Sequence, residues 1–176
     1  MHIDKADLII EGIESETDAV FTTDLHGAFN VSRIYKYAVT RGVGITAQLN
    51  VANVMQTMLN CDLDMQHSIR LMALLDHELY AATLALYIQL DDGTHMLIDG
   101  NHRIAETARR AAYRGQETIE VRALVITLAE AQQFRIRYYE QTRTGRREIS
   151  SAEMLAEIQG VYSDRDGTIT DMRGAA

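Results

Sequence analysis

One stretch of this chain, residues 83–127, restricts the possible folds more than any other, because it specifies two strands, a helix and a third strand in that order. The strand-like runs TLALYIQL and THMLI flank Asp92-Gly93, a dipeptide typical of a tight hairpin turn. Apolar residues then recur at helical spacing over residues 103–114, and Gly115 ends that helix. TIEVRALVI reads as one more strand. This order predicts a mixed α/β fold.

The first 82 residues are predicted to be mostly helical. Four segments there show helical periodicity after a residue that favours the N-cap position. They are residues 6–14 after Asp4, VSRIYKYAVTR after Asn30, the run from Val51 after Asn50, and MQHSIRLMALLDHE after Asp64. The one strand expected in this part is AVFTTDL, residues 19–25.

Two capping boxes predict helices in the last third of the chain. Thr127 stands three residues before Glu130, and Ser150 three residues before Glu153. The first box opens LAEAQQFRIRYYEQ and the second opens SAEMLAEIQGVY. RTGRRE, between them, is expected to be a loop.

Length and composition indicate a single domain over residues 1–176. The chain has no proline and no low-complexity tract, so no linker is evident. No apolar run approaches the roughly 20 residues of a membrane helix, and we therefore expect no membrane partner. The single cysteine, Cys61, excludes an internal disulfide and favours the cytoplasm. Its helical surroundings favour a core position over a nucleophilic role.

The charge of the chain is uneven. The formal net charge of −8 argues against a surface that binds nucleic acid throughout. Residues 103–147, however, contain 10 arginines and 5 glutamates and are the one basic segment. Arg109, Arg110 and Arg114 are expected to lie on a solvated helix face. Arg143, Arg146 and Arg147 form the densest basic loop, which is a candidate phosphate or DNA contact.

The run Asp99-Gly100-Asn101-His102-Arg103 is the strongest functional signal. A strand that turns at Gly100 directly into a helix leaves the first helical N–H groups unpaired, and these groups with the helix dipole suit a phosphate. Arg103 can hold phosphate oxygens in a bidentate manner, and His102 can add a hydrogen bond. Asp99 can cap the helix or help to hold a metal ion. The same five residues also fit an ordinary exposed turn and helix start.

The segment LIDGNHRIAETARRAAYRGQETIEVRALVI resembles the ParB/sulfiredoxin-like superfamily. In that superfamily a strand, an Asp-Gly-x-His-Arg motif, a helix and a strand form a nucleotide-phosphate site. The resemblance spans residues 83–160 and implies a ParB/sulfiredoxin-like core there. Residues 1–82 are divergent and lack the proline-rich opening common to partition proteins.

The resemblance extends to a second, looser motif in LAEAQQFRIRYYEQTRTGRREISSAEMLAEI. Family members have a helix that ends in Glu-Asn at this place, followed by an arginine. Glu140 matches the family glutamate, and Gln141 replaces the usual asparagine. Arg143 or Arg146 would supply the second phosphate contact.

Two activities of the superfamily fit this chain poorly. Sulfinic-acid reductases need a cysteine directly before His-Arg, where this chain has Asn101. Partition proteins add a helix-turn-helix DNA reader and a dimerisation domain, for which 176 residues leave little room.

Three functions remain. The first is a nucleoside triphosphatase or phosphotransferase in which Gly100, Asn101, His102 and Arg103 hold ATP, ADP or CTP with Mg²⁺. In it, Glu140 would be the metal ligand and the leading catalytic carboxylate, and Asp24 is a weaker candidate. The second is a ParB-like DNase, which would act on DNA phosphodiesters. The third is a non-catalytic regulator of plasmid or phage origin that binds a nucleotide or a protein.

Overall fold

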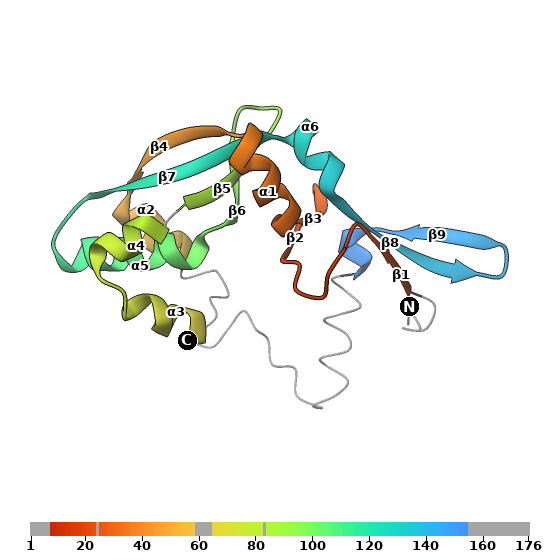
Figure 1. Cartoon of the computed structure of the whole chain (residues 1–176), viewed down its shortest axis with the longest axis horizontal. Helices are drawn as coiled ribbons and strands as arrows, with labels where there is room; N and C mark the ends of the chain where they lie inside the picture. The colour runs from red at the N-terminus through yellow and green to blue at the C-terminus, as the bar shows by residue number, and fades with distance from the viewer. Residues whose placement is uncertain (1–7, 24, 59–64, 83, 155–176) are drawn as a thin grey trace. The chain divides into compact units, whose positions relative to one another are not determined.

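The computed structural model describes residues 8–23, 25–58, 65–82 and 84–154. The chain divides into two compact units (Figure 1). The central unit is Tyr35–Glu130, and the terminal unit joins Met1–Ile34 to Ala131–Ala176. Helices and strands mix in the chain, which confirms the predicted α/β class. A single domain over residues 1–176 stays a prediction.

A four-stranded sheet organises the central unit. Its strands lie in the order β4 (Val43–Asn50), β7 (Thr118–Thr127), β5 (Leu84–Gln89) and β6 (His95–Asp99). The β5–β7 pair is parallel and the other two pairs are antiparallel. Helix α5 (Asn101–Tyr113) connects β6 to β7. The first six residues of β7 alternate between exposed and buried side chains, as expected for a sheet with one covered face.

The helices of the central unit build its core with this sheet. Helices α2 (Val51–Met58) and α5 contribute Val54, Ile104 and Ala108 to one buried cluster with β5 and β7 residues. Two shorter helices, α3 (Met65–Met72) and α4 (Asp76–Ala82), precede β5. Burial of the apolar faces of α2 and α5 is the main stabilising contribution here.

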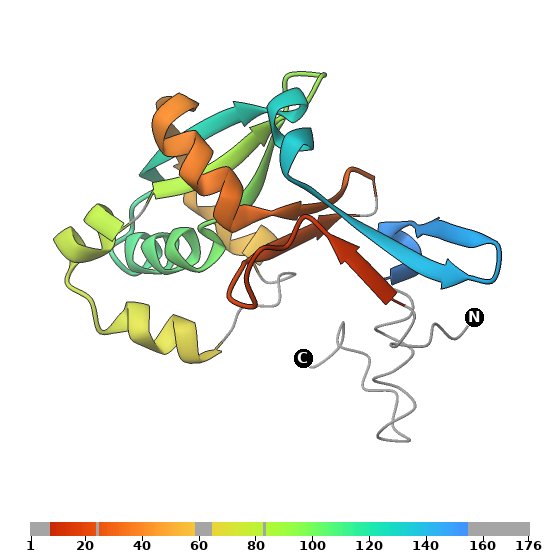
Figure 2. The same cartoon turned by 45° about the vertical axis from the view of Figure 1, so that its right-hand side comes forward.

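The terminal unit contains a five-stranded sheet. Its strands are β1 (Leu8–Glu11), β2 (Val20–Thr23), β3 (Gly27–Asn30), β8 (Arg135–Thr142) and β9 (Gly145–Ile149). The order is β1-β8-β3-β2, and β9 pairs with β8 as a hairpin (Figure 2). Helix α1 (Val31–Arg41) follows β3, and α6 (Leu128–Ala131) with a 3₁₀ turn, η2 (Gln132–Phe134), leads into β8.

Several caps predicted from sequence are confirmed. The Asn30 Oδ1 atom accepts the Arg33 N–H at 3.1 Å at the start of α1, and Asn50 does the same for Asn53 at 3.0 Å at the start of α2. Both capping boxes form, with hydrogen bonds of 2.8–3.2 Å between Thr127 and Glu130 and between Ser150 and Glu153. The predicted hairpin and the strands β2 and β7 are also confirmed.

Other predictions for the first 82 residues are wrong. The segment predicted as a helix over residues 6–14 contains β1, and the strand β4 was not predicted. The helix predicted over residues 65–78 ends at Met72, and α4 starts afresh at Asp76. The restart has a local cause, because the Glu78 carboxylate accepts the Leu75 N–H at 2.7 Å and caps α4.

The helix predicted over residues 128–141 is also wrong beyond its first turns. Only α6 and η2 form, and β8 begins at Arg135. Ile136 is buried between the exposed Arg135 and Arg137, which is the two-residue period of a strand. Pairing with β1, β3 and β9 therefore overrides the helical start signal of Thr127 and Glu130.

Some predictions fall outside the described residues. These are the positions of Cys61, Asp24, Asp4 and Asp64 and the end of the last predicted helix, of which residues 151–154 are described and helical. Within the described residues, no helix has the length and apolar character needed to cross a membrane.

Candidate functional site

The run of residues 99–103 lies where β6 turns into α5. Asp99 is the last residue of β6, opposite Leu86 of β5, and α5 begins at Asn101. Gly100, between them, has φ 105° and ψ 4°, a left-handed conformation that L side chains rarely adopt. A β-carbon on Gly100 would also lie 3.2 Å from the Ala85 Cα atom. Backbone conformation and close packing both explain the glycine.

Asp99 fixes Arg103 in the first turn of α5. Its Oδ2 atom accepts a hydrogen bond from Arg103 Nη2 at 2.9 Å, and its Oδ1 atom accepts the Gly100 N–H at 2.8 Å. The Arg103 side chain is 21% exposed and that of Asp99 is 43% exposed. The arginine is therefore ordered at the helix start by a carboxylate that solvent reaches.

Asp99 does not cap α5, which corrects one prediction. The N terminus of the helix has no side-chain cap hydrogen bond. Both Asp99 oxygens have other partners, since one accepts the adjacent Gly100 N–H and the other accepts Arg103. The four-residue spacing of Asp99 and Arg103 is the sequence signal for this ion pair.

The other predicted residues of this run also lie at the start of α5. Asn101 and His102 are the first two residues of the helix, and both side chains are half-buried. Thr107, one turn further on, donates its hydroxyl hydrogen bond to the Arg103 carbonyl at 2.8 Å. The structure thus brings residues 99–103 together around one helix end.

The second group of predicted site residues belongs to the terminal unit. Glu140 and Gln141 lie in β8, opposite Arg147 and Arg146 of β9, and Arg143 lies in the turn between the two strands. Because Glu140 is in a strand, the prediction that it ends a helix is wrong. The two groups of residues that the resemblance joins into one site lie in different units.

The prediction that RTGRRE is a loop is wrong beyond Arg143 and Thr144, because Gly145–Ile149 form β9. Ion pairs engage two of the three arginines in this segment. Arg147 binds Glu140 at 3.1 Å and Glu153 at 2.9 Å, and Arg146 binds Glu11 at 2.9 Å. The Ser150 amide first, and then Arg147, lower the pKa of Glu153 to about 2. Its two carboxylate partners, Glu153 foremost, raise the pKa of Arg147. Arg147 thus links the β8–β9 hairpin to the last described helix, and Arg146 links β9 to β1.

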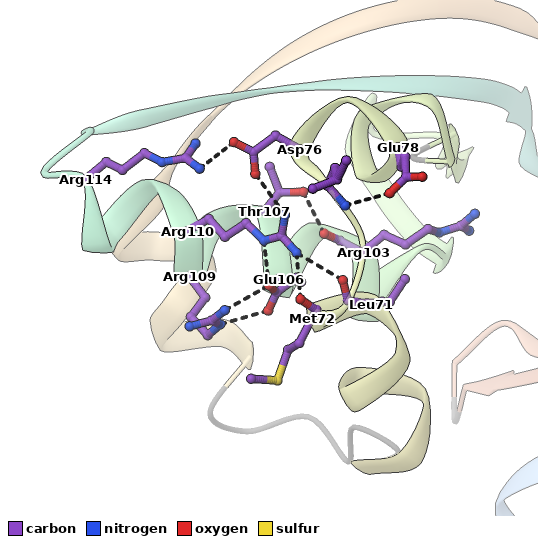
Figure 3. A network of polar contacts seen from close by, with 11 residues as sticks. Leu71, Met72, Asp76, Glu78, Arg103, Glu106, Thr107, Arg109, Arg110 and Arg114 are labelled. Atoms are coloured by element: carbon purple, nitrogen blue, oxygen red, sulfur yellow. Dashed lines mark hydrogen bonds and ion pairs between the residues drawn. The ribbon is translucent and has the colours of Figure 1, made fainter.

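Arg109, Arg110 and Arg114 of the basic segment form a network of ion pairs on α5 (Figure 3). Glu106 has a side chain only 7% exposed, and it binds both Arg109, at 2.8 and 2.9 Å, and Arg110, at 2.7 Å. The hydrogen bonds from Arg109 are the main cause that lowers the pKa of Glu106. Sequence reasoning missed this buried acid, although its spacing from the two arginines indicates both pairs.

Arg110 ties α5 to the segment between α3 and α4. It donates to Asp76 at 2.8 Å and to the Leu71 carbonyl at 3.0 Å, and Arg114 also binds Asp76. Hydrogen bonds from Arg110 and then Arg114 lower the pKa of Asp76. The prediction that these arginines decorate a solvated face is therefore wrong for Arg110, whose side chain is 14% exposed.

No candidate metal centre is evident in the described part of the chain. Among those residues, no group of three or more histidine, cysteine, aspartate or glutamate side chains is placed to hold a metal ion. Magnesium bound together with nucleotide phosphates needs fewer protein ligands, and Asp99 and Glu140 stay the predicted ones.

Comparison with known proteins finds no relative: no family model, no curated protein and no solved structure matches the chain. The likeness to the ParB/sulfiredoxin-like superfamily therefore stays a resemblance of short motifs.

Proposed function

We propose that the start of α5 binds the phosphate groups of a nucleotide, and that the protein is a magnesium-dependent nucleoside triphosphatase or phosphotransferase. One observation supports this most: α5 starts without a side-chain cap directly after the left-handed Gly100, with Arg103 held in its first turn. The single cysteine and the lack of a membrane-length apolar run in the sequence favour a cytoplasmic location.

The chemistry of this helix end suits an oxyanion. The first N–H groups of a helix carry partial positive charge, and a guanidinium adds a planar pair of donors that matches phosphate oxygens. Catalysis of phosphoryl transfer would then depend mainly on positioning the nucleotide phosphates and neutralising their negative charge.

Asp99 gives a reason for magnesium. Its carboxylate is 43% exposed beside the proposed phosphate position, and two anions in close proximity repel each other. A nucleotide that arrives as its magnesium complex carries less negative charge, and the ion can accept a carboxylate oxygen. The resemblance implies Asn101 and His102 as further phosphate contacts. By the resemblance alone, Glu140 would orient the nucleophile and Gln141, Arg143 and Arg146 would contact phosphate, and these four residues lie in the terminal unit.

Calorimetry with ATP, ADP and CTP, each with and without Mg²⁺, tests the proposal. We expect Arg103→Ala to weaken binding of the preferred nucleotide by about tenfold or more, because a charge-assisted hydrogen bond is lost. Arg109→Ala, six residues further along the same helix, is the matched control and should retain wild-type affinity. Glu140→Gln should bind the nucleotide but lose turnover.

The results separate the candidate functions. Wild-type affinity in Arg103→Ala, or no nucleotide binding by the wild type, would contradict the proposal. Binding without turnover in the wild type would favour the non-catalytic regulator.

A DNase is the second candidate, and the observation in its favour is the exposed pair Arg143 and Arg146 at the tip of the β8–β9 hairpin. Plasmid nicking at low salt, suppressed steeply as salt rises, would support it, because contacts to phosphates release counterions. Loss of nicking in an Arg143→Ala variant would place the contact at the hairpin.

A further inference from the structure

The outer edge of β4 is an unusually unprotected strand edge. In the four-stranded sheet β4 lies at the end of the order, and no other strand among the described residues pairs with its outer side. All eight residues pair with β7 without a register shift. The sequence of β4, VGITAQLN, has no charged residue and no proline. Charge, proline and bulges are the usual means by which edge strands avoid pairing with another chain.

The side chains of β4 continue the buried face of the sheet. Residues directly opposite in an antiparallel pair share a face, and the four alternate apolar residues of β4 lie opposite buried residues of β7. These pairs are Val43 with Val125, Ile45 with Ala123, Ala47 with Val121 and Leu49 with Ile119. Yet Val43 is 66% exposed and Ile45 is 37% exposed. The first half of β4 therefore presents apolar core-facing side chains that its own unit leaves exposed.

We propose that β4 pairs with β4 of a second copy of this chain, so that two four-stranded sheets join into one about a two-fold axis. An antiparallel strand edge is its own complement, since its outward N–H and C=O groups match those of an identical strand turned by two-fold symmetry. The partner at this edge is therefore a strand. The alternate apolar side chains of β4 in the second copy can pack against the exposed Val43 and Ile45.

The lack of charged residues on β4 permits a second copy to approach at this edge. The chain has a net charge of −8, so two copies repel over most of their surfaces and can meet most readily at a strip that bears no charge. An acidic or basic peptide would find no opposite charge on β4 to select it.

Side-chain direction limits the register, and the pairing of all four apolar residues of β4 with one another selects one. Apolar residues must face the same side in both copies, which requires that an odd-numbered residue opposes an odd-numbered one. With Thr46 opposite Thr46 of the other copy, Val43 faces Leu49 and Ile45 faces Ala47. This register buries both exposed apolar side chains against apolar ones and puts the two Thr46 side chains on the opposite face.

Cross-linking tests this register directly. Directly opposite Cα atoms in a sheet are about 4.5–5.5 Å apart, within the range of a disulfide. In a Cys61→Ser background, Thr46→Cys should form a disulfide-linked dimer under mild oxidation. Gln89→Cys, on β5 at the other side of β7, is the matched control and should stay monomeric.

Sedimentation equilibrium supplies the second measurement. The wild type should show twice the mass of one chain, and Thr46→Lys should raise the dissociation constant by about tenfold or more, because two lysines would meet at the axis. Gln89→Lys should leave the dissociation constant unchanged. If Thr46→Lys does not fold, the Thr46→Cys cross-link decides alone. The mass of one chain at all concentrations of the wild type, or no cross-link in Thr46→Cys, would overturn the proposal.

Discussion

Two separate physical requirements favour glycine at position 100, one from the backbone conformation and one from packing. The φ of 105° at Gly100 disfavours any β-carbon, and a β-carbon there would lie only 3.2 Å from the Ala85 Cα atom of β5. Gly93, in the β5–β6 turn, has a similar φ of 83° but nothing within 4 Å of the place of its β-carbon. The two glycines therefore separate the conformational effect from the packing effect.

Substitution of both glycines by alanine measures this difference. We expect Gly93→Ala to lower the free energy of unfolding by about 1 kcal/mol, from backbone strain alone. Gly100→Ala should lower it by about 2 kcal/mol or more, since the clash with Ala85 adds to the strain. Urea unfolding followed by circular dichroism gives both values. Equal losses would show that β5 and α5 separate readily at this point.

Glu153 makes stability depend on acid pH. Its pKa is about 2 in the folded chain against an ordinary 4.5, so the folded state binds fewer protons than the unfolded state between these values. Its stabilising contribution is complete above pH 4.5 and is lost as the pH falls towards 2. Glu153→Gln keeps an acceptor for the capping box but cannot titrate.

Urea midpoints measured from neutral pH down to about 2 test this linkage. Stability should fall less steeply with acid in Glu153→Gln than in the wild type. Glu148→Gln, an exposed residue of β9, is the control and should follow the wild type. The same acid slope in all three proteins would contradict the low pKa of Glu153.

At the scale of elements, α5 holds its neighbours by a polar network as well as by its apolar face. Glu106 organises Arg109 and Arg110, and Arg110 reaches Asp76 and the carbonyl groups at the end of α3 (Figure 3). The Glu106 side chain is 7% exposed, and the side chains of Arg109 and Arg110 are 49% and 14% exposed. Removal of the Glu106 carboxylate would leave the guanidinium donors of Arg109 and Arg110 without this acceptor in a partly desolvated environment.

Glu106→Ala should therefore lower the free energy of unfolding by roughly 1–3 kcal/mol. Glu117→Ala is the control, because Glu117 is exposed and contributes only its carbonyl, to the Val51 N–H. Chemical denaturation of the two variants and the wild type provides the measurement. A stability loss in Glu106→Ala no larger than in the control would show that the network adds nothing to the packing of α5.

Elements defined by local signals could be predicted from sequence, and those defined by distant partners could not. Helix ends are marked by residues whose contacts lie within a few positions in sequence, here Asn30, Asn50 and Gly115. Helices α1, α2 and α5 form where predicted. β4 and β8 depend on strands far away in sequence. The residues around Gln132 and Gln133 have acceptable helix propensities, so the local sequence does not indicate that β8 pairs with other strands.

At the scale of the whole molecule, one half of the predicted site is defined by local sequence and the other half depends on distant partners. Residues 99–103 are adjacent in sequence, so a strand, a glycine and a helix suffice to bring them together. The link from these residues to Glu140 and Arg143 depends on a resemblance in which Glu140 ends a helix, whereas here Glu140 lies in the middle of a hairpin within the other unit.

The Asp99–Arg103 pair has a consequence for affinity. An arginine that moves freely in solvent loses up to about 1.5–2 kcal/mol of rotamer entropy when a ligand immobilises it. Arg103 is already ordered by its hydrogen bond to Asp99. The rotamer entropy of its side chain is therefore lost on folding and not on ligand binding. An anion that bound at the start of α5, as proposed, would meet a side chain that is already ordered, and this saving would be the largest share of the binding free energy for a small ligand.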